Sequence, residues 1–170
     1  MIMSSKEILD NLLAKGLYEE KPALKDHIFA LIERLIDFKT FIDKNSFSQK
    51  IPSELFECLV KSAVLHDLGK ITYRFQKKLR YGNLPDVLHD FLAGTKDINI
   101  RHEFLSLVWS IVLLGNEKFD SMIRTAILLH HYNEYFIEDK SISRILRNPL
   151  YRRGFRKYAK FIIENKEIIE

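Results

Sequence analysis

The chain has 170 residues, of which 46% are hydrophobic and 29% charged, proportions that are typical of globular proteins and exclude a disordered or fibrous chain. Its single cysteine, Cys58, excludes an intramolecular disulfide and a cysteine-rich zinc site, so any metal chemistry has to use histidine and carboxylate ligands. The net charge is +4, and residues 140–160 carry eight basic side chains and no acidic one, so the rest of the chain is acidic on balance.

Neither a targeting signal nor a membrane span is predicted. The N-terminus reaches Glu7 before any long apolar run, which is unlike a signal peptide. The most apolar segment, residues 104–114, is much shorter than the roughly 20 residues that a spanning helix needs. We therefore expect one soluble, cytoplasmic domain over residues 1–170, without membrane contact.

Apolar residues recur at helical spacing in the first half of the chain. Ser4 or Ser5 is expected to cap the N-terminus of a first helix, and Gly16 is expected to end it. A second helix is predicted to start near Pro22, with apolar residues 24, 28, 31, 35 and 38 on one stripe. His27 lies on the same side of this helix, so its side chain is expected to face inward. A third helix opens at residues 52–53 and ends near Gly69, and one or two further turns precede a loop at 81–85.

The second half also follows a helical pattern. Asn99 is predicted to cap a helix over 100–114, and Asp120 to cap the next. Asn148-Pro149 separates a short basic helix from a final helix over 150–169. Strand patterns are absent, so we predict an all-α bundle of about six to eight helices with a basic C-terminal helical segment at 140–170.

Histidines recur at or near the ends of the predicted helices. Five of the six fall there, mostly on different helices: His27, His66, His102, His130 and His131. A helical bundle can bring such side chains together at one metal site. A single histidine without a motif is more often structural, so the functional interpretation depends on the neighbouring residues.

The strongest local signal is the HDLGK stretch at residues 66–70. Neutral His66 offers a nitrogen ligand, and Asp67 has two oxygens that can bridge two metals. Gly69 allows the backbone to turn sharply beside the site. Lys70 offers a fixed positive charge for a phosphate oxygen.

Three other stretches contain histidine. RHEFLS at residues 101–106 places His102 in the first turn of a helix, where Glu103 has the position of an ordinary capping residue. The side chains of the HH pair at 130–131 point about 100° apart, yet both can bind an ion that sits between them. The pair His89-Asp90 is not followed by Gly-Lys, and we interpret it as structural.

Taken together, HDxGK at 66–70, the Phe-Gln pair at 75–76, RHExxS at 101–106 and HH at 130–131 resemble the HD superfamily. More narrowly, they resemble the HD nuclease of type I CRISPR interference, which occurs fused to a helicase or as a separate small protein. The matching order runs from His27 to His131. The resemblance implies an HD-superfamily helical bundle with two divalent metals side by side in its core.

The resemblance also implies a ligand set. The first metal would be held by His27, His66 and Asp67, and Asp67 would bridge to a second metal held by His102, His130 and His131. A final carboxylate is expected for the first metal. Its candidates are Asp139, Glu138 and Glu164, and the alternatives are a water molecule or a shortened chain that lacks this ligand.

Function follows from this ligand set. Histidine-rich sites suit manganese, nickel, cobalt or iron better than magnesium, and we expect manganese. The resemblance implies a hydrolase that cleaves single-stranded DNA, with RNA as a second substrate, in CRISPR antiviral defence, partnered by the interference helicase and the effector complex. Asp67 is expected to fix the separation of the two metals, and Lys70 to neutralise charge on the phosphoryl oxygens. Two alternatives remain open, a phosphohydrolase acting on small nucleotides and an inactive HD scaffold.

The basic segment at 140–160 has three interpretations. Arginines interleaved with Tyr151, Phe155 and Tyr158 are typical of a surface that contacts phosphates and stacks bases. The same aromatic residues can instead pack on the core beneath a solvated basic face. The segment can also dock on the helicase or the effector complex.

Overall fold

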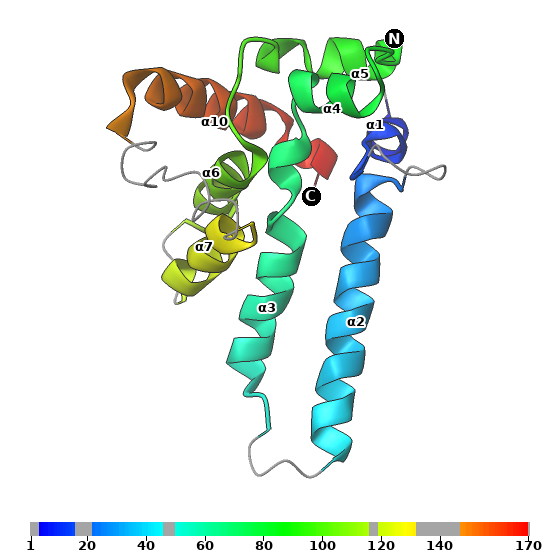
Figure 1. Cartoon of the computed structure of the whole chain (residues 1–170), viewed down its shortest axis with the longest axis vertical. Coiled ribbons are helices and arrows are strands. Elements are labelled where there is room, and N and C mark those ends of the chain that lie inside the picture. Colours follow the sequence, from blue (N-terminus) through cyan, green and yellow to red (C-terminus); the bar gives the residue numbers. More distant parts are fainter. Residues whose placement is uncertain (1–3, 16–21, 46–49, 116–118, 132–146, 170) are drawn as a thin grey trace.

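The computed structural model describes residues 4–15, 22–45, 50–115, 119–131 and 147–169, which form an all-α bundle without a named strand (Figure 1). The helices and 3₁₀ turns are α1 (Ser5–Asn11), α2 (Leu24–Lys44), α3 (Ser53–Leu65), η1 (Leu68–Lys70), α4 (Tyr73–Leu79), α5 (Asp86–Phe91), η2 (Ala93–Thr95), α6 (His102–Leu114), α7 (Asp120–Leu129) and α10 (Pro149–Ile169). The predicted fold class is thereby confirmed, and it is consistent with an HD fold. None of the described helices is long and apolar enough to cross a bilayer.

Several helix boundaries follow the predicted signals. Ser4 caps α1, and its hydroxyl accepts a hydrogen bond from the Glu7 amide at 3.2 Å. Pro52 directly precedes α3, and α10 starts at Pro149. The predicted stop at Gly16 and the short basic helix before residue 147 lie outside the described residues.

Two predicted caps are wrong. Asn99 does not cap α6, because the chain stays extended through Arg101 while Ile98 is buried and Ile100 packs against the core. Asp120 is the first residue of α7 rather than its cap, and its carboxylate accepts a hydrogen bond from Arg124 at 2.9 Å. Tertiary packing and a local ion pair thus override the cap signals.

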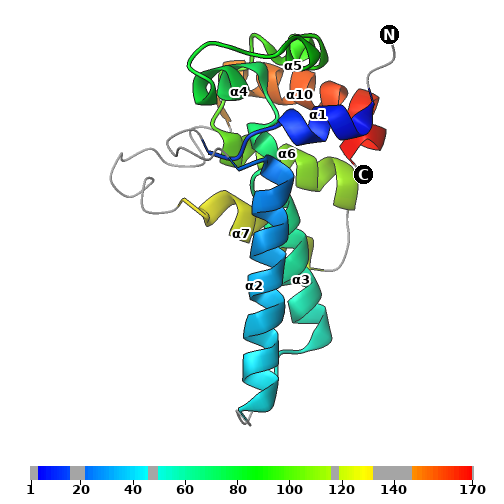
Figure 2. The same cartoon turned by 90° about the vertical axis from the view of Figure 1, so that its right-hand side faces the viewer.

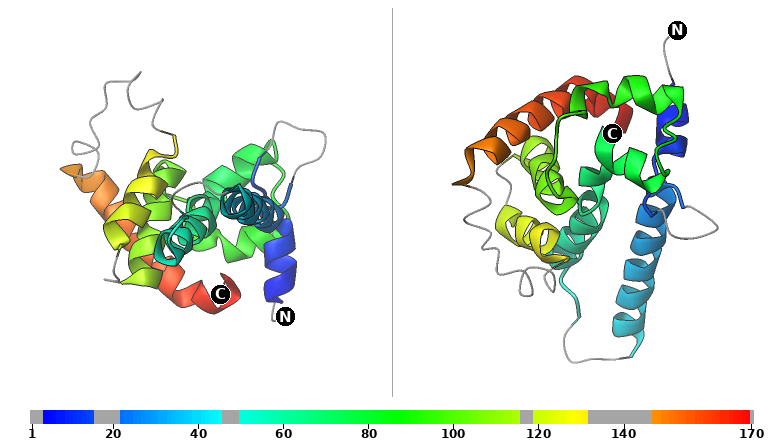
Figure 3. Two further views of the ribbon diagram at one scale, coloured as in Figure 1. Left: turned by 90° about the horizontal axis from the view of Figure 1, so that it is seen from below. Right: turned by 45° about the horizontal axis from the view of Figure 1, so that its top comes forward.

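Helix α6 is the centre of the bundle. Its first two turns are buried on nearly all sides, and Trp109 and Phe104 are fully enclosed. It packs against η1, α7 and α10, so it separates α10 on one side from α7 on the other (Figures 1 and 3). The residues that start α6 are therefore held firmly in the middle of the molecule.

Helices α2 and α3 form a long antiparallel pair that extends away from the rest of the bundle (Figures 1 and 2). Only Leu24 on the predicted inner stripe of α2 is fully buried, and Phe38 is 51% exposed. The placement of Phe38 on an inward face is therefore wrong. Among the described residues, the distal half of α2 packs against α3, and its face turned away from α3 is exposed.

The turn η1 is fixed from two sides. A β-carbon on Gly69 would lie 1.8 Å from the carbonyl oxygen of His102, so glycine is required there for close approach to α6 rather than for the sharp turn that we predicted. The Gly69 amide donates to the hydroxyl of Ser106 on α6 at 2.8 Å. On the other side, the Gln76 side chain donates to the Lys70 carbonyl at 3.1 Å.

Helix α10 also reaches this turn through Tyr158, which is fully buried. The Tyr158 hydroxyl accepts a hydrogen bond from Trp109 Nε1 at 3.0 Å. It donates toward the carbonyl oxygens of Leu68 and Ile71, which lie 3.1 and 3.0 Å away. Burial raises the pKa of Tyr158, so the hydroxyl keeps its proton for this bond. Tyr158 therefore packs on the core, and it is not free to stack on a base.

We predict that Gly69→Ala lowers the free energy of unfolding by at least about 1 kcal/mol, because the added methyl group collides with the backbone of α6. Thermal denaturation followed by circular dichroism measures the change. Gly94→Ala is the matched control, because a β-carbon there meets only the side chain of Phe161 at 3.9 Å. An equal effect of the two substitutions would contradict the close approach of η1 and α6.

Candidate metal centre

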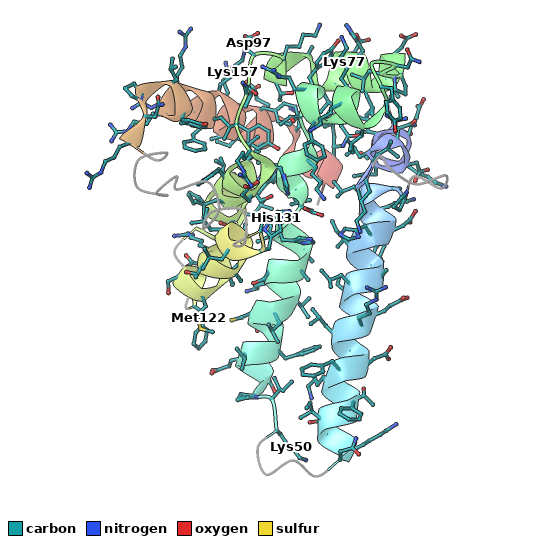
Figure 4. All side chains as sticks on the ribbon, in the orientation of Figure 1. Lys50, Lys77, Asp97, Met122, His131 and Lys157 are labelled. Atoms are coloured by element: carbon teal, nitrogen blue, oxygen red, sulfur yellow. The ribbon has the colours of Figure 1, made fainter. Side chains whose placement is uncertain are left out.

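The six ligands that the resemblance implies meet at one place in the bundle. They come from the first turn of α2, the end of α3, the start of η1, the start of α6 and the end of α7, and they are His27, His66, Asp67, His102, His130 and His131. Figure 4 places His131 where α3, α6 and α7 come together. Residues more than one hundred positions apart in the chain are thus neighbours in space.

Asp67 lies at the centre of this group, with only 3% of its side chain exposed. Its Oδ2 is 3.2 Å from Nε2 of His27 and 3.2 Å from Nε2 of His66. Its Oδ1 is 3.5 Å from Nε2 of His102 and 3.8 Å from Nε2 of His130. One oxygen therefore faces each pair of histidines, which is the arrangement that a bridging carboxylate requires.

The side chains form two groups that can each hold a cation. The ligand atoms of His27, His66 and Asp67 lie within 4.8 Å of one another, and so do those of His102, His130 and His131. This division is the one that the resemblance implies. Three ligands in each group leave room in a coordination shell for water and substrate.

The tautomers of three histidines are set by their Nδ1 atoms. Nδ1 of His66 is 2.8 Å from the carbonyl of Ala63, and Nδ1 of His130 is 2.5 Å from the carbonyl of Ile127. Nδ1 of His102 is 3.4 Å from Glu103 Oε2. These oxygens only accept hydrogen bonds, so Nδ1 carries the proton and Nε2 keeps a lone pair.

The lone pairs on these Nε2 atoms face other acceptors. They point toward the Asp67 oxygens, and Nε2 of His102 lies 3.4 Å from Nε2 of His130. Among the described residues, Asp67 Oδ1 is buried and receives no hydrogen bond. Facing acceptors repel one another, whereas a cation between them is attracted to all of them. The donor set therefore fits divalent metal ions.

Protonation states agree with this interpretation. The pKa of Asp67 lies well below its usual range although burial by itself raises it, and the Lys70 ammonium group 2.5 Å from Oδ2 keeps the carboxylate ionised. Burial, helped by the neighbouring His131, lowers the pKa of His130 to about 4. At neutral pH Asp67 is ionised and His130 is neutral, which are the forms that bind metals.

Lys70 is buried beside the carboxylate. Its Nζ lies 2.5 Å from Asp67 Oδ2, and its side chain is 9% exposed. The ammonium group is 5.9 Å from the centre of the Phe75 ring. Lys70 therefore compensates the charge of Asp67 in this structure. To contact a phosphate, its ammonium group has to bind Asp67 and the phosphate together or leave Asp67.

Glu103 has a role that sequence reasoning missed. Its interpretation as an ordinary capping residue is wrong, because its side chain is fully buried and the start of α6 has no side-chain cap. The carboxylate forms an ion pair with Arg101 and faces Nδ1 of His102. Glu103 thus orients the His102 ring. The signal was present in the RHE triplet, since a carboxylate next to a ligand histidine is a common second partner of that ring.

The final carboxylate remains without an assignment. Asp139 and Glu138 lie outside the described residues. Glu164 is exposed on α10, pairs with Lys160 at 3.6 Å, and belongs to neither group. The pair His89-Asp90 also lies outside both groups, and the His89 ring packs against Tyr73.

We predict that Mn²⁺ binds the wild-type chain and raises its melting temperature, because a ligand at 100 times its Kd stabilises a fold by about 2.7 kcal/mol. EDTA should reverse the shift. Asp67→Asn should abolish it, since the variant removes the charge that both groups share. Metal analysis and calorimetry give the number of ions per chain.

Asp90→Asn is the matched control for Asp67→Asn, because its side chain is 76% exposed and belongs to neither ligand group. Circular dichroism checks that both variants fold. Mn²⁺ binding by Asp67→Asn at the wild-type level would contradict the proposed centre.

We predict that Glu103→Gln weakens metal affinity by about 10–100-fold, because the neutral amide is a weaker acceptor than the carboxylate and holds the proton of His102 on Nδ1 less firmly. Glu164→Gln is the control on an exposed position. If calorimetry shows no loss for Glu103→Gln, this carboxylate does not position His102. A loss for Glu164→Gln would instead identify it as a ligand.

Comparison with known proteins supports a specific relationship. No protein-family model and no solved structure matches the chain. The chain is 44% identical over 173 aligned residues to the CRISPR-associated nuclease/helicase Cas3 of Methanothermobacter thermautotrophicus. The alignment covers 98% of this chain and 21% of that protein, so the chain spans about a fifth of the relative's length. The resemblance is thereby confirmed, and the chain is a homologue of a Cas3 nuclease/helicase, consistent with the HD nuclease domain of type I CRISPR interference.

Proposed function

We propose that this chain is a divalent-metal-dependent nuclease that hydrolyses phosphodiester bonds of single-stranded DNA in CRISPR interference, with RNA as a second substrate. The observation that carries the proposal is the buried Asp67 carboxylate, whose two oxygens each face a pair of histidine nitrogens. The homologous nuclease/helicase supports the same class of chemistry.

The chain's own residues prepare the site in three ways. Asp67 gives both groups a common ligand and so fixes their separation. The bonds to Ala63 and Ile127 hold the rings of His66 and His130 with Nε2 toward the centre. When bound, two divalent cations supply Lewis-acid stabilisation of the phosphodiester and lower the pKa of the attacking water.

We assign Lys70 to the reaction together with Asp67. Its ammonium group keeps Asp67 ionised and in place, and it is a buried cation of the site that can stabilise charge on the phosphoryl oxygens. Nitrogen ligands outnumber oxygen ligands in both groups, which favours manganese over magnesium; nickel, cobalt and iron have the same preference.

The proposal extends to organisation and partners. We infer that residues 1–170 act as a single HD nuclease domain in the cytoplasm. The relative's name joins a nuclease to a helicase, and the chain corresponds to a fifth of it. This supports the interference helicase and its effector complex as the partners that deliver the single strand.

Two other functions compete with this one. A phosphohydrolase for small nucleotides would use the same ligands, and an inactive scaffold would use none of them. The nearly complete ligand geometry favours an enzyme, and the homologous nuclease/helicase favours a polynucleotide over a free nucleotide.

We predict that the wild-type chain shortens labelled single-stranded DNA with Mn²⁺ and leaves it intact with EDTA. Asp67→Asn should lower the rate by more than about 100-fold, a larger loss than removal of a second partner of a ligand causes. Gel analysis of the DNA, together with a panel of free and cyclic nucleotides, measures both activities.

Asp90→Asn is again the control, and it should retain the wild-type rate. Nucleotide turnover with intact DNA would overturn the proposal in favour of the small-molecule enzyme. Inactivity on every substrate by a protein that binds metal would favour the scaffold.

A further inference from the structure

We propose that α10 carries a second nucleic-acid contact surface that grips the phosphate backbone of a single strand away from the metal centre. This inference rests on the proposed function, because a nuclease needs affinity for its polymer as well as chemistry. The surface, here called the basic face, consists of Arg152, Arg153, Arg156, Lys157 and Lys160.

The basic face is continuous because of helical spacing. Arg152, Arg156 and Lys160 follow at intervals of four residues, and Arg153 and Lys157 do the same beside them. At about 100° per residue these five positions lie within an arc of about 140°. All five side chains are exposed. The opposite side of α10 is buried through Tyr158 and its apolar neighbours, so these five cations lie on the side of the helix that is turned away from the core.

The arginines on this face are available for a ligand. Lys157 pairs with Asp97 at 2.7 Å, and Lys160 lies 3.6 Å from Glu164. Arg152, Arg153 and Arg156 lie within ion-pair distance of no carboxylate in the described part of the chain. Three unpaired guanidinium groups on two helical turns suit successive phosphates, because each can donate two parallel hydrogen bonds.

A cavity of about 540 Å³ adjoins the face, between the first turns of α10 and the segment before α6. Arg153 and Lys157 contribute cations to its lining, and Asn99 and Asn148 contribute amide groups. The exposed acid in the lining, Asp97, is paired with Lys157. The cavity has the size of a small-ligand site and can seat a phosphate with its sugar.

The aromatic residues of α10 decide the kind of contact. Tyr158 is fully buried, and Phe155 packs against the core with Tyr151 beside it. Tyr151 is partly exposed and lines the cavity, so contact through this face is dominated by charge, with one aromatic ring at its edge. Binding to phosphates alone is independent of sequence and falls steeply with salt concentration.

The position of the face separates it from the chemistry. Helix α6 lies between α10 and α7, and Figure 4 shows Lys157 and His131 on opposite sides of α6. A nucleic-acid strand that contacts both the basic face and the metal centre has to pass around the edge of α6. The basic face thus adds affinity for the nucleic acid, because it binds the segment next to the one that lies at the metal centre around Asp67.

We predict that Arg152→Glu/Arg156→Glu weakens binding of a fluorescent single-stranded oligothymidine by at least 10-fold and flattens its salt dependence. Two lost phosphate contacts reduce the slope of log K against log salt by about 1.4 for a single strand. Fluorescence anisotropy in EDTA, with Asp67→Asn in every protein, measures binding without cleavage.

Lys44→Glu/Lys50→Glu is the matched control, since it makes the same change in net charge on exposed residues at the far end of α2 and α3. It should leave affinity and slope unchanged. Arg152→Gln/Arg156→Gln gives a milder test if the reversal disturbs folding, which thermal denaturation reports.

Wild-type affinity and slope for both α10 variants would overturn the inference, and so would an equal loss in the control pair. Intact DNA binding with lost association to the helicase would assign the face to a protein partner instead, which also overturns it. Because the assay involves no cleavage, arginine-dependent binding by a chain that cuts no DNA would refute the proposed nuclease and leave this surface standing.

Discussion

A buried negative charge organises this protein. Moving a carboxylate out of water costs several kcal/mol unless the surrounding groups compensate it. Lys70 places its ammonium group against Asp67, and imidazoles from α2, α6, α7 and the end of α3 surround the carboxylate. The ends of α2, α3, α6 and α7 all point to this carboxylate. The contacts that bring these helix ends together are therefore the same contacts that form the candidate metal centre.

The compensation is incomplete without a cation. Several Nε2 lone pairs and an Asp67 oxygen face one another in the same small volume. Protonating an imidazole would relieve the repulsion, but burial works against it at His130. A cation held between these groups would therefore stabilise the fold as well as supply the chemistry proposed for the site, because it would join the helices that carry its ligands.

The sequence predicts the local part of this picture well. Helix existence and the start of α1 follow from periodicity and cap residues, which are properties of neighbouring residues. The grouping of the six side chains spans distant positions and was implied by the motif resemblance. What fails depends on distant contacts. The start of α6 is shifted because Ile98 and Ile100 are drawn into the core. Phe38 is exposed because, in the described part of the chain, the outer half of α2 packs against α3 on one face. The burial of Glu103 and the close approach at Gly69 also require the packed bundle.

The bond between Tyr158 and the turn after Asp67 has a consequence for the order of folding. It joins residues 87 and 90 positions apart, and the tyrosine enters the core only when α10 docks. During synthesis, a nascent chain that has emerged only as far as His131 has every histidine of the centre but lacks the helix that fixes η1. The turn that carries Asp67 can therefore take its final shape only once α10 is available to dock on it.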